Sequence, residues 1–161
     1  MKRLALTFAA ALLATQAAGQ EFIVGLGYSD YSDGNASDAT AIDLEYHLKP
    51  FDQRGNFTIG LGGVLAADSE ENVFFGVGLV NKYQFNENWF AELTFMPGAF
   101  FEGSSNNDLG QTLEFRSLLA FGYRFNPKSA ISLGFQHKSN AALSSVNPGV
   151  NTLTVRYHHS F

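Results

Sequence analysis

The sequence predicts an all-β fold, an eight-stranded antiparallel transmembrane β-barrel, and three observations support this prediction. Eight segments alternate apolar and polar residues, a period that gives a strand one apolar and one polar face. Their connections alternate between short turns and long polar loops, as in the barrels of bacterial outer membranes. The polar faces carry charges of both signs among glycines, which is the filling of a narrow barrel rather than the apolar core of a soluble one.

The predicted strands follow one another through the whole chain after an N-terminal leader. They lie at 22–29, 42–48, 57–65, 75–83, 89–95, 113–125, 131–139 and 151–161. Long loops are expected at 30–38, 67–72, 102–109 and before the last strand, and turns at 50–55, 86–88 and 126–128. Phe161, with alternating apolar residues before it, is similar to the assembly signal that ends bacterial outer-membrane proteins.

The two faces of each strand predict what lies inside and outside the barrel. Charged residues expected inside are Asp43, Glu45, Lys82, Glu92, Glu114, Arg116, Arg124 and Arg156. The opposite faces are rich in Phe, Tyr and Trp, which suit lipid and its interfacial girdles. With Glu92 and Glu114 pointing inward, we expect no other acidic side chain on the lipid face near the last two strands.

The N-terminus has the pattern of a secretory signal peptide, with a basic start, a short apolar run and small residues before a polar one. We place the cleavage after Gly19, with Ala17 and Ala18 as alternatives. A membrane anchor is the other interpretation, but the run is shorter than the roughly 20 apolar residues that a spanning helix needs. The domain prediction is a signal peptide at 1–19 and an outer-membrane β-barrel at 20–161.

The composition excludes several classes of function. A net charge of −5 argues against a nucleic-acid partner, because a phosphate-binding face needs clustered Lys and Arg. The chain has no cysteine, so its stability does not come from disulfides. Neither a metal nor a cofactor is expected: His158 and His159 lack a matching third ligand and are read as interfacial, and no phosphate-binding glycine loop is present.

Polar side chains interrupt the apolar faces of the last two strands. The apolar face along 131–135 continues into His137 and Ser139, and Asn151 opens that of the final strand. We expect the Cα atoms of His137 and Ser139 to lie roughly 7 Å apart, with Asn151 roughly 5 Å away on the next strand. A His that takes the proton of a Ser lets the hydroxyl attack a carbonyl, while a third residue orients the imidazole. The pattern therefore predicts acyl transfer near the outer leaflet, where lipopolysaccharide carries acyl esters.

At these residues the sequence resembles the PagL-type lipid A 3-O-deacylases, outer-membrane barrels that cleave the ester at position 3 of lipid A. The resemblance lies in His137-x-Ser139-Asn140-Ala141, then Asn147-Pro148-Gly149 and Asn151. It implies that Ser139 is the nucleophile and His137 the base, that lipid A is the substrate, and that the protein is in the outer membrane.

The resemblance also implies an oxyanion site and exposes one departure from the family. Asn140 and the backbone amides just after Ser139, at Ala141 and Ala142, would hold the oxyanion. The family's acidic residue falls at Asn151, whose amide can orient an imidazole but cannot stabilise imidazolium by charge. In serine triads the acid-to-amide change costs about 10⁴ in turnover where it selects the wrong tautomer. Activity is therefore expected to be weak or absent.

The other interpretation is a non-enzymatic small barrel of the OmpA- or OmpW-like kind, acting in membrane integrity or adhesion. The face on which His137 and Ser139 lie distinguishes the two, because the enzyme needs both of them on the lipid side beside Asn151. Expected partners are lipid A and outer-membrane lipid, with the barrel assembly machinery during biogenesis. A homodimer is the alternative to a monomer, and the sequence does not decide between them.

Overall fold

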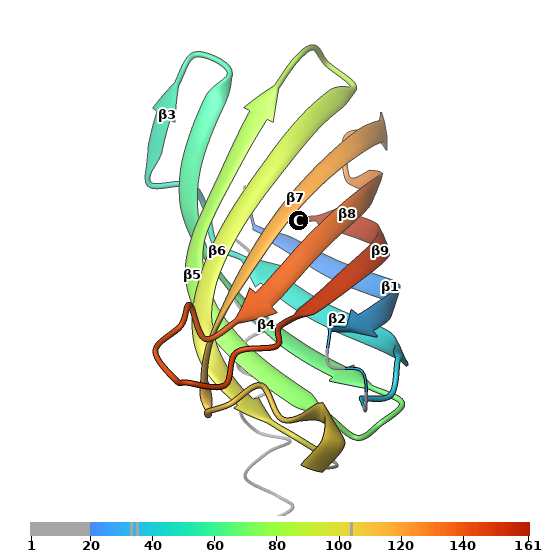
Figure 1. Ribbon diagram of the computed structural model, residues 1–161. Coiled ribbons are helices and arrows are strands. Elements are labelled where there is room, and N and C mark those ends of the chain that lie inside the picture. The colour runs from blue at the N-terminus through green and yellow to red at the C-terminus, as the bar shows by residue number, and fades with distance from the viewer. Residues whose placement is uncertain (1–19, 33, 35, 104) are drawn as a thin grey trace, which may run out of the picture.

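The computed structural model describes residues 20–161 except 33, 35 and 104, so the predicted signal peptide lies outside the described residues (Figure 1). The strands are β1 (Glu21–Tyr31), β2 (Ala39–His47), β3 (Asp52–Arg54), β4 (Phe57–Asp68), β5 (Val73–Gln84), β6 (Trp89–Phe101), β7 (Leu113–Asn126), β8 (Ser129–Ser139) and β9 (Val150–Ser160). One short 3₁₀ helix, Ser105–Asn107, lies in the loop between β6 and β7. No helix of the described residues is long and apolar enough to cross a membrane.

Eight of these strands form a closed antiparallel barrel. Neighbouring strands follow the order β2-β1-β9-β8-β7-β6-β5-β4, and a further pairing of β2 with β4 closes the sheet. The loops that follow β1, β6 and β8 lie at the lower end in Figure 1, and the described residues begin and end at the other end, where Phe161 N–H donates to Gln20 O. The predicted eight-stranded barrel is confirmed.

The predicted element boundaries need two corrections. The turn expected at 50–55 contains β3, which pairs only with β4 and reverses direction through Gly55 at a φ of 59°. Gly adopts this left-handed backbone at no steric cost, so the chain forms a tight hairpin there. Strands also reach further than apolar alternation indicates: β1 continues through Asp30 to Tyr31, and β4 through Asp68.

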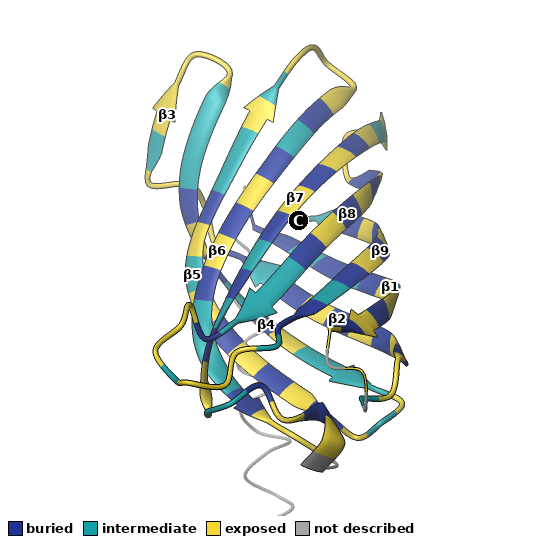
Figure 2. Ribbon diagram, in the orientation of Figure 1, coloured by how far each residue is buried: buried dark blue, intermediate teal, exposed yellow. Residues whose placement is uncertain are grey.

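Burial alternates along the central part of the long strands, as the bands in Figure 2 show. Of the eight charged residues predicted inside, six are fully buried, and Lys82 and Arg124 line a cavity at the end opposite the long loops. Glu45 Oε1 lies 2.6 Å from Arg116 Nη2 and 3.1 Å from Arg156 Nη2. The two arginines thus compensate the charge of Glu45 inside the barrel, which offsets the penalty of burying an unpaired charge there.

Candidate active site

Three of the predicted site residues, His137, Ser139 and Asn151, lie on the outer wall of the barrel at the end that carries the long loops. Along 130–136 of β8 the even positions are buried and the odd positions are exposed, and His137 and Ser139 continue the odd series. Asn151 occupies the outer face of β9 and is directly paired with His137 across the two strands. All three side chains are partly buried. His137, Ser139 and Asn151 thus share the outer face of two neighbouring strands.

One hydrogen bond fixes the histidine ring. His137 Nδ1 and Asn151 Oδ1 are 2.8 Å apart, and because the amide oxygen is an acceptor, Nδ1–H donates. The other nitrogen, Nε2, is then the unprotonated one and can act as a base. A Cβ built on Gly149 would come within 3.0 Å of His137 Cε1 and 3.6 Å of Nε2, so the ring packs against that glycine. Its Nε2 edge accordingly lies on the loop side of the pair, the side where Ser139 follows.

The loop after Ser139 is held in an unusual backbone conformation. Ala141 and Ala142 have φ values of 55° and 61°, a region that non-glycine residues seldom adopt and that costs free energy. The side-chain amide of Asn140, which is fully buried, donates from Nδ2 to Leu109 O at 2.8 Å and to Val146 O at 2.7 Å. The surrounding structure therefore holds these two left-handed residues in place.

Asn140 has no donor left for a substrate in this arrangement. Its side-chain N–H groups go to backbone carbonyls, and its backbone N–H donates to Asn147 Oδ1 at 3.0 Å. That bond occupies the oxygen of the exposed Asn147 side chain and leaves its Nδ2 amino group without an acceptor among the described residues. Asn147 belongs to the motif that resembles the deacylase family, but the sequence predicts no role for it.

An apolar groove runs along the outer wall from the site toward the other end of the barrel. Its volume is about 290 Å³, and its lining residues are Ala91, Leu119, Ala120, Phe121, Leu133, Gly134, Phe135 and Leu153. Phe135 pairs with Leu153. This pair lies two residues along each strand from the pair of His137 and Asn151, away from the long loops. The groove therefore begins directly beneath the polar site.

Comparison with protein-family models decides the family. The model described as lipid A 3-O-deacylase (PagL) matches residues 25–160, which is most of the chain. This chain belongs to the PagL family. Its members are lipid A deacylases, and this one is an outer-membrane β-barrel.

Solved structures show the same fold. The crystal structure of the outer membrane enzyme PagL superposes with a TM-score of 0.70 at 18% identity, covering 88% of this chain and 99% of that one. A de novo designed transmembrane β-barrel gives 0.61 at 12% identity, covering 91% and 98%. Neisserial surface protein A gives 0.53 at 12% identity, covering 88% and 96%. None of the curated proteins matched the chain.

In this PagL-family chain, an acidic residue does share the outer face with the site, so the expectation of none is wrong. Asp30 on β1 is exposed and is paired directly with Asn151. The sequence pattern predicts a loop from Asp30 onward, because polar residues replace apolar ones there, but β1 continues to Tyr31. Glu92 and Glu114, by contrast, are buried inside the barrel, as predicted.

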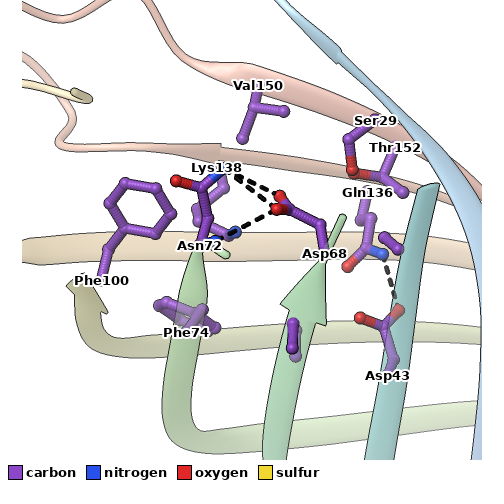
Figure 3. Close-up of a pocket in the computed structure, with 13 residues that line it drawn as sticks. Ser29, Asp43, Asp68, Asn72, Phe74, Phe100, Gln136, Lys138, Val150 and Thr152 are labelled. Carbon is purple, nitrogen blue, oxygen red and sulfur yellow. Dashed lines mark hydrogen bonds between the residues drawn. The ribbon is translucent and has the colours of Figure 1, made fainter. Parts of the chain in front are cut away.

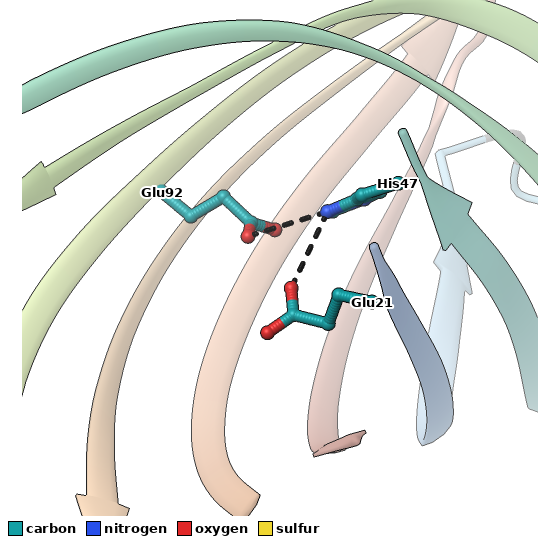
Figure 4. Close-up of side chains that lie close together, drawn as sticks. All are labelled: Glu21, His47 and Glu92. Atoms are coloured by element: carbon teal, nitrogen blue, oxygen red, sulfur yellow. Dashed lines mark ion pairs between the residues drawn. The ribbon is translucent and has the colours of Figure 1, made fainter. Parts of the chain in front are cut away.

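A second polar cluster lies inside the barrel near the opposite end. Carboxylate oxygens of Glu21 and Glu92 and a ring nitrogen of His47 all lie within 4.8 Å of one another, a spacing that a metal ion could bridge (Figure 4). Lys82 Nζ already bonds Glu21 and lies 3.1 Å from Glu92 Oε2. The lysine ammonium thus supplies the cation that these carboxylates need, and we assign the cluster to the packing of the barrel.

His158 belongs to the interior as well, which corrects the prediction that it is interfacial. It is buried, and its Nε2 lies 2.7 Å from Ser132 Oγ. Only His159 remains on the outer side, where its ring packs edge-on against Phe161.

The interior at the loop end offers no room for a lipid. A cavity of about 20 Å³, the space of a water molecule, lies among Asp43, Asp68, Asn72, Gln136 and Lys138 (Figure 3). Lys138, which stands between His137 and Ser139 in the sequence, points inward, with its Nζ 5.0 Å from the ring centres of Phe74 and Phe100.

Proposed function

We propose that this chain hydrolyses an acyl ester of lipid A with Ser139 as nucleophile, His137 as general base and Asn151 as the residue that orients the imidazole. The hydrogen bond from His137 Nδ1 to Asn151 Oδ1, on the lipid-facing wall beside Ser139, is the observation that carries this proposal. A donor at Nδ1 leaves Nε2 as the base, the tautomer that acyl transfer requires.

Each step then follows from ordinary acyl-transfer chemistry. His137 Nε2 takes the hydroxyl proton of Ser139 while Oγ attacks the ester carbonyl, forming a tetrahedral oxyanion. Collapse of that intermediate breaks the ester bond, and the proton passes from Nε2 to the sugar oxygen that leaves. Water, deprotonated in turn by His137, attacks the acyl-serine; the Oγ–acyl bond breaks, the fatty acid leaves, and the proton passes from Nε2 to Ser139 Oγ.

We assign the oxyanion to the backbone amides of Ala141 and Ala142, which no hydrogen bond within the described part of the barrel occupies. Asn140 then acts by holding their unusual backbone, and the free Nδ2 of Asn147 is a further donor on the same loop. Donors fixed before the reaction stabilise developing charge without reorganising.

The substrate side of the proposal rests on the groove. An ester at Ser139 places its acyl chain over Phe135 and Leu153, where an apolar groove of about 290 Å³ continues along the wall. Lipid A reaches such a site sideways from the outer leaflet, so no opening through the barrel is needed. The outward placement of His137 and Ser139 favours this function over a purely structural barrel.

The amide at Asn151 lowers the expected rate. A carboxylate there would stabilise the imidazolium that forms in the transition state, whereas an amide oxygen supplies only a dipole. We therefore propose a deacylase slower than a member that carries the acid.

Mass spectrometry of lipid A from cells that express the protein tests the proposal. We expect a fraction of lipid A to lose one ester-linked hydroxyacyl chain, and none to do so with Ser139→Ala. Ser145→Ala is the matched control, because that serine is exposed on the same loop and is not one of the proposed site residues. An unchanged lipid A profile with folded wild-type protein in the outer membrane would refute deacylation.

A further inference from the structure

A row of outward-facing residues crosses three neighbouring strands at the level of the site. Asp30 on β1 is paired with Asn151 on β9, and Asn151 is paired with His137 on β8. Directly paired residues on one face of an antiparallel sheet have Cβ atoms about 4.5–5.5 Å apart, close enough for polar side chains to bond. The order of the row is thus carboxylate, amide, imidazole.

Asn151, the middle residue of the row, has one polar group that is not bonded to His137. Asn151 uses Oδ1 to accept the His137 Nδ1–H, which leaves its Nδ2 amino group. No other hydrogen bond to the Asn151 side chain occurs within residues 20–161 as described. An amide can accept at oxygen and donate at nitrogen at the same time, so it can transmit polarisation between two neighbours.

The carboxylate at the end of the row is uncommitted. Asp30 is exposed and makes no side-chain hydrogen bond or ion pair with any residue that the structure describes. Asp38, on the same side of the barrel, differs in this respect, because it accepts bonds from the Tyr28 hydroxyl and the Tyr31 amide. Hydrogen bonds therefore hold the Asp38 carboxylate in place, whereas none among the described residues holds the Asp30 carboxylate away from Asn151.

We propose that Asp30 is a positioning residue that supplies, through Asn151, the negative charge that the amide itself lacks. Turned toward its strand partner by rotation of its side chain, the Asp30 carboxylate would accept Nδ2–H of Asn151, fix the orientation of that amide and make Oδ1 a stronger acceptor for His137 Nδ1–H. The imidazolium formed when Ser139 gives up its proton is then stabilised by a charge one residue further away. This inference rests on the proposed function.

Distance sets the size of the effect. The Coulomb attraction falls inversely with separation, so a carboxylate at about twice the distance of a directly bonded acid gives about half the stabilisation. Asp30 therefore offsets part of what the amide costs. It acts on the transition state and not on lipid binding, so its loss should lower kcat and leave KM unchanged.

A double-mutant cycle on purified protein with lipid A in detergent micelles tests the inference, using Asp30→Asn alone and in the Asn151→Glu background. In the wild-type background we expect Asp30→Asn to lower kcat about tenfold, with KM within about twofold. With Asn151→Glu the charge is already beside the imidazole and repels Asp30, so Asp30→Asn should leave kcat unchanged or raise it. Asp30→Glu should retain activity, and Glu102→Gln, an exposed loop acid, is the matched control.

The outcomes separate this inference from the proposed function. An active wild type whose kcat does not respond to Asp30→Asn overturns the inference alone, and so does an equal loss in both backgrounds, which indicates a structural role. A wild type whose lipid A hydrolysis is insensitive to Ser139→Ala overturns the proposed function, and the inference with it. Unfolding of Asp30→Asn would be contradictory too, because an exposed, unbonded carboxylate contributes little stability.

Discussion

The outer wall at the loop end and the interior of the barrel both hold polar side chains, but they hold them differently. Inside, Glu45 contacts two arginines, and Arg156 donates from Nη1 to Glu92 Oε1 at 2.8 Å. On the wall, His137 makes one side-chain hydrogen bond, to Asn151, within the described structure. The interior groups are bound to one another on several sides, whereas the wall groups leave atoms free.

This difference indicates what each region does. Glu45, Glu92, Arg116 and Arg156 are paired with opposite charges inside the barrel, so their role is to fill it. A hydroxyl, an imidazole and an amide on the lipid face add little packing, so the fold does not need them there. Polar residues that the fold does not need are the better indicators of chemistry.

Substituting the wall residues should give the largest loss of activity without a loss of stability. Ser139→Ala and His137→Ala should each lower deacylation by about 10³-fold or more, because each removes a member of the catalytic pair. Stability should stay within about 0.5 kcal/mol of wild type. Turnover on lipid A and urea unfolding in detergent measure the two quantities. His159→Gln, on the outer face at the far end, is the matched control. Near-normal turnover in both alanine variants would place the nucleophile elsewhere.

The reverse result is expected for an interior residue. Glu45→Ala leaves Arg116 and Arg156 without the carboxylate that pairs them, and breaking such a buried ion pair costs about 3–5 kcal/mol. Urea unfolding should shift to lower concentration, while turnover per folded molecule stays unchanged. A loss below about 1 kcal/mol would show that the interior charges are not held by one another.

The same contrast explains what the sequence could predict. Strict alternation of apolar and polar residues identified the barrel and the inner and outer faces, because period two leaves each side chain a single face. It also placed His137, Ser139 and Asn151 on one surface. The roles of these residues remain proposals.

Other features of the site depend on contacts between distant segments. Asp30 was missed because the strand continues past the apolar band, where alternation carries no hydrophobic signal. The anchoring of Asn140 to Leu109 requires the loop between β6 and β7 to approach the loop between β8 and β9. β3 forms because Gly55 allows a tight hairpin, which alternation does not show.

Placing an acid at position 151 measures how much activity the amide of Asn151 costs. Asn151→Glu should raise kcat about tenfold or more, since a carboxylate beside the imidazole stabilises its charged form and the amide costs serine triads up to about 10⁴. Steady-state kinetics on lipid A measures the change, with folding checked by circular dichroism. Equal or lower activity in the folded variant would show that this position is adapted to an amide.

The smallest effect is expected from filling the groove. Ala91 pairs with Phe121, and Phe121 pairs with Leu133, which lies four residues before His137 on β8. Ala91→Phe therefore adds a large ring to the groove at the level of Leu133. Hydrolysis of long acyl chains should fall about tenfold relative to short ones, as expected for lost apolar contacts. Rates on lipid A analogues of different chain length measure this ratio, and an unchanged preference would place the acyl chain elsewhere.

Trapping the nucleophile tests the central claim most directly. A serine-reactive fluorophosphonate, added to the folded protein in detergent, should modify Ser139 and no other serine, as peptide mass spectrometry would show. Labelling should disappear in Ser139→Ala and fall sharply in His137→Ala, because the hydroxyl reacts only when the imidazole takes its proton. Labelling of another residue, or undiminished labelling in Ser139→Ala, would contradict a catalytic site on this wall.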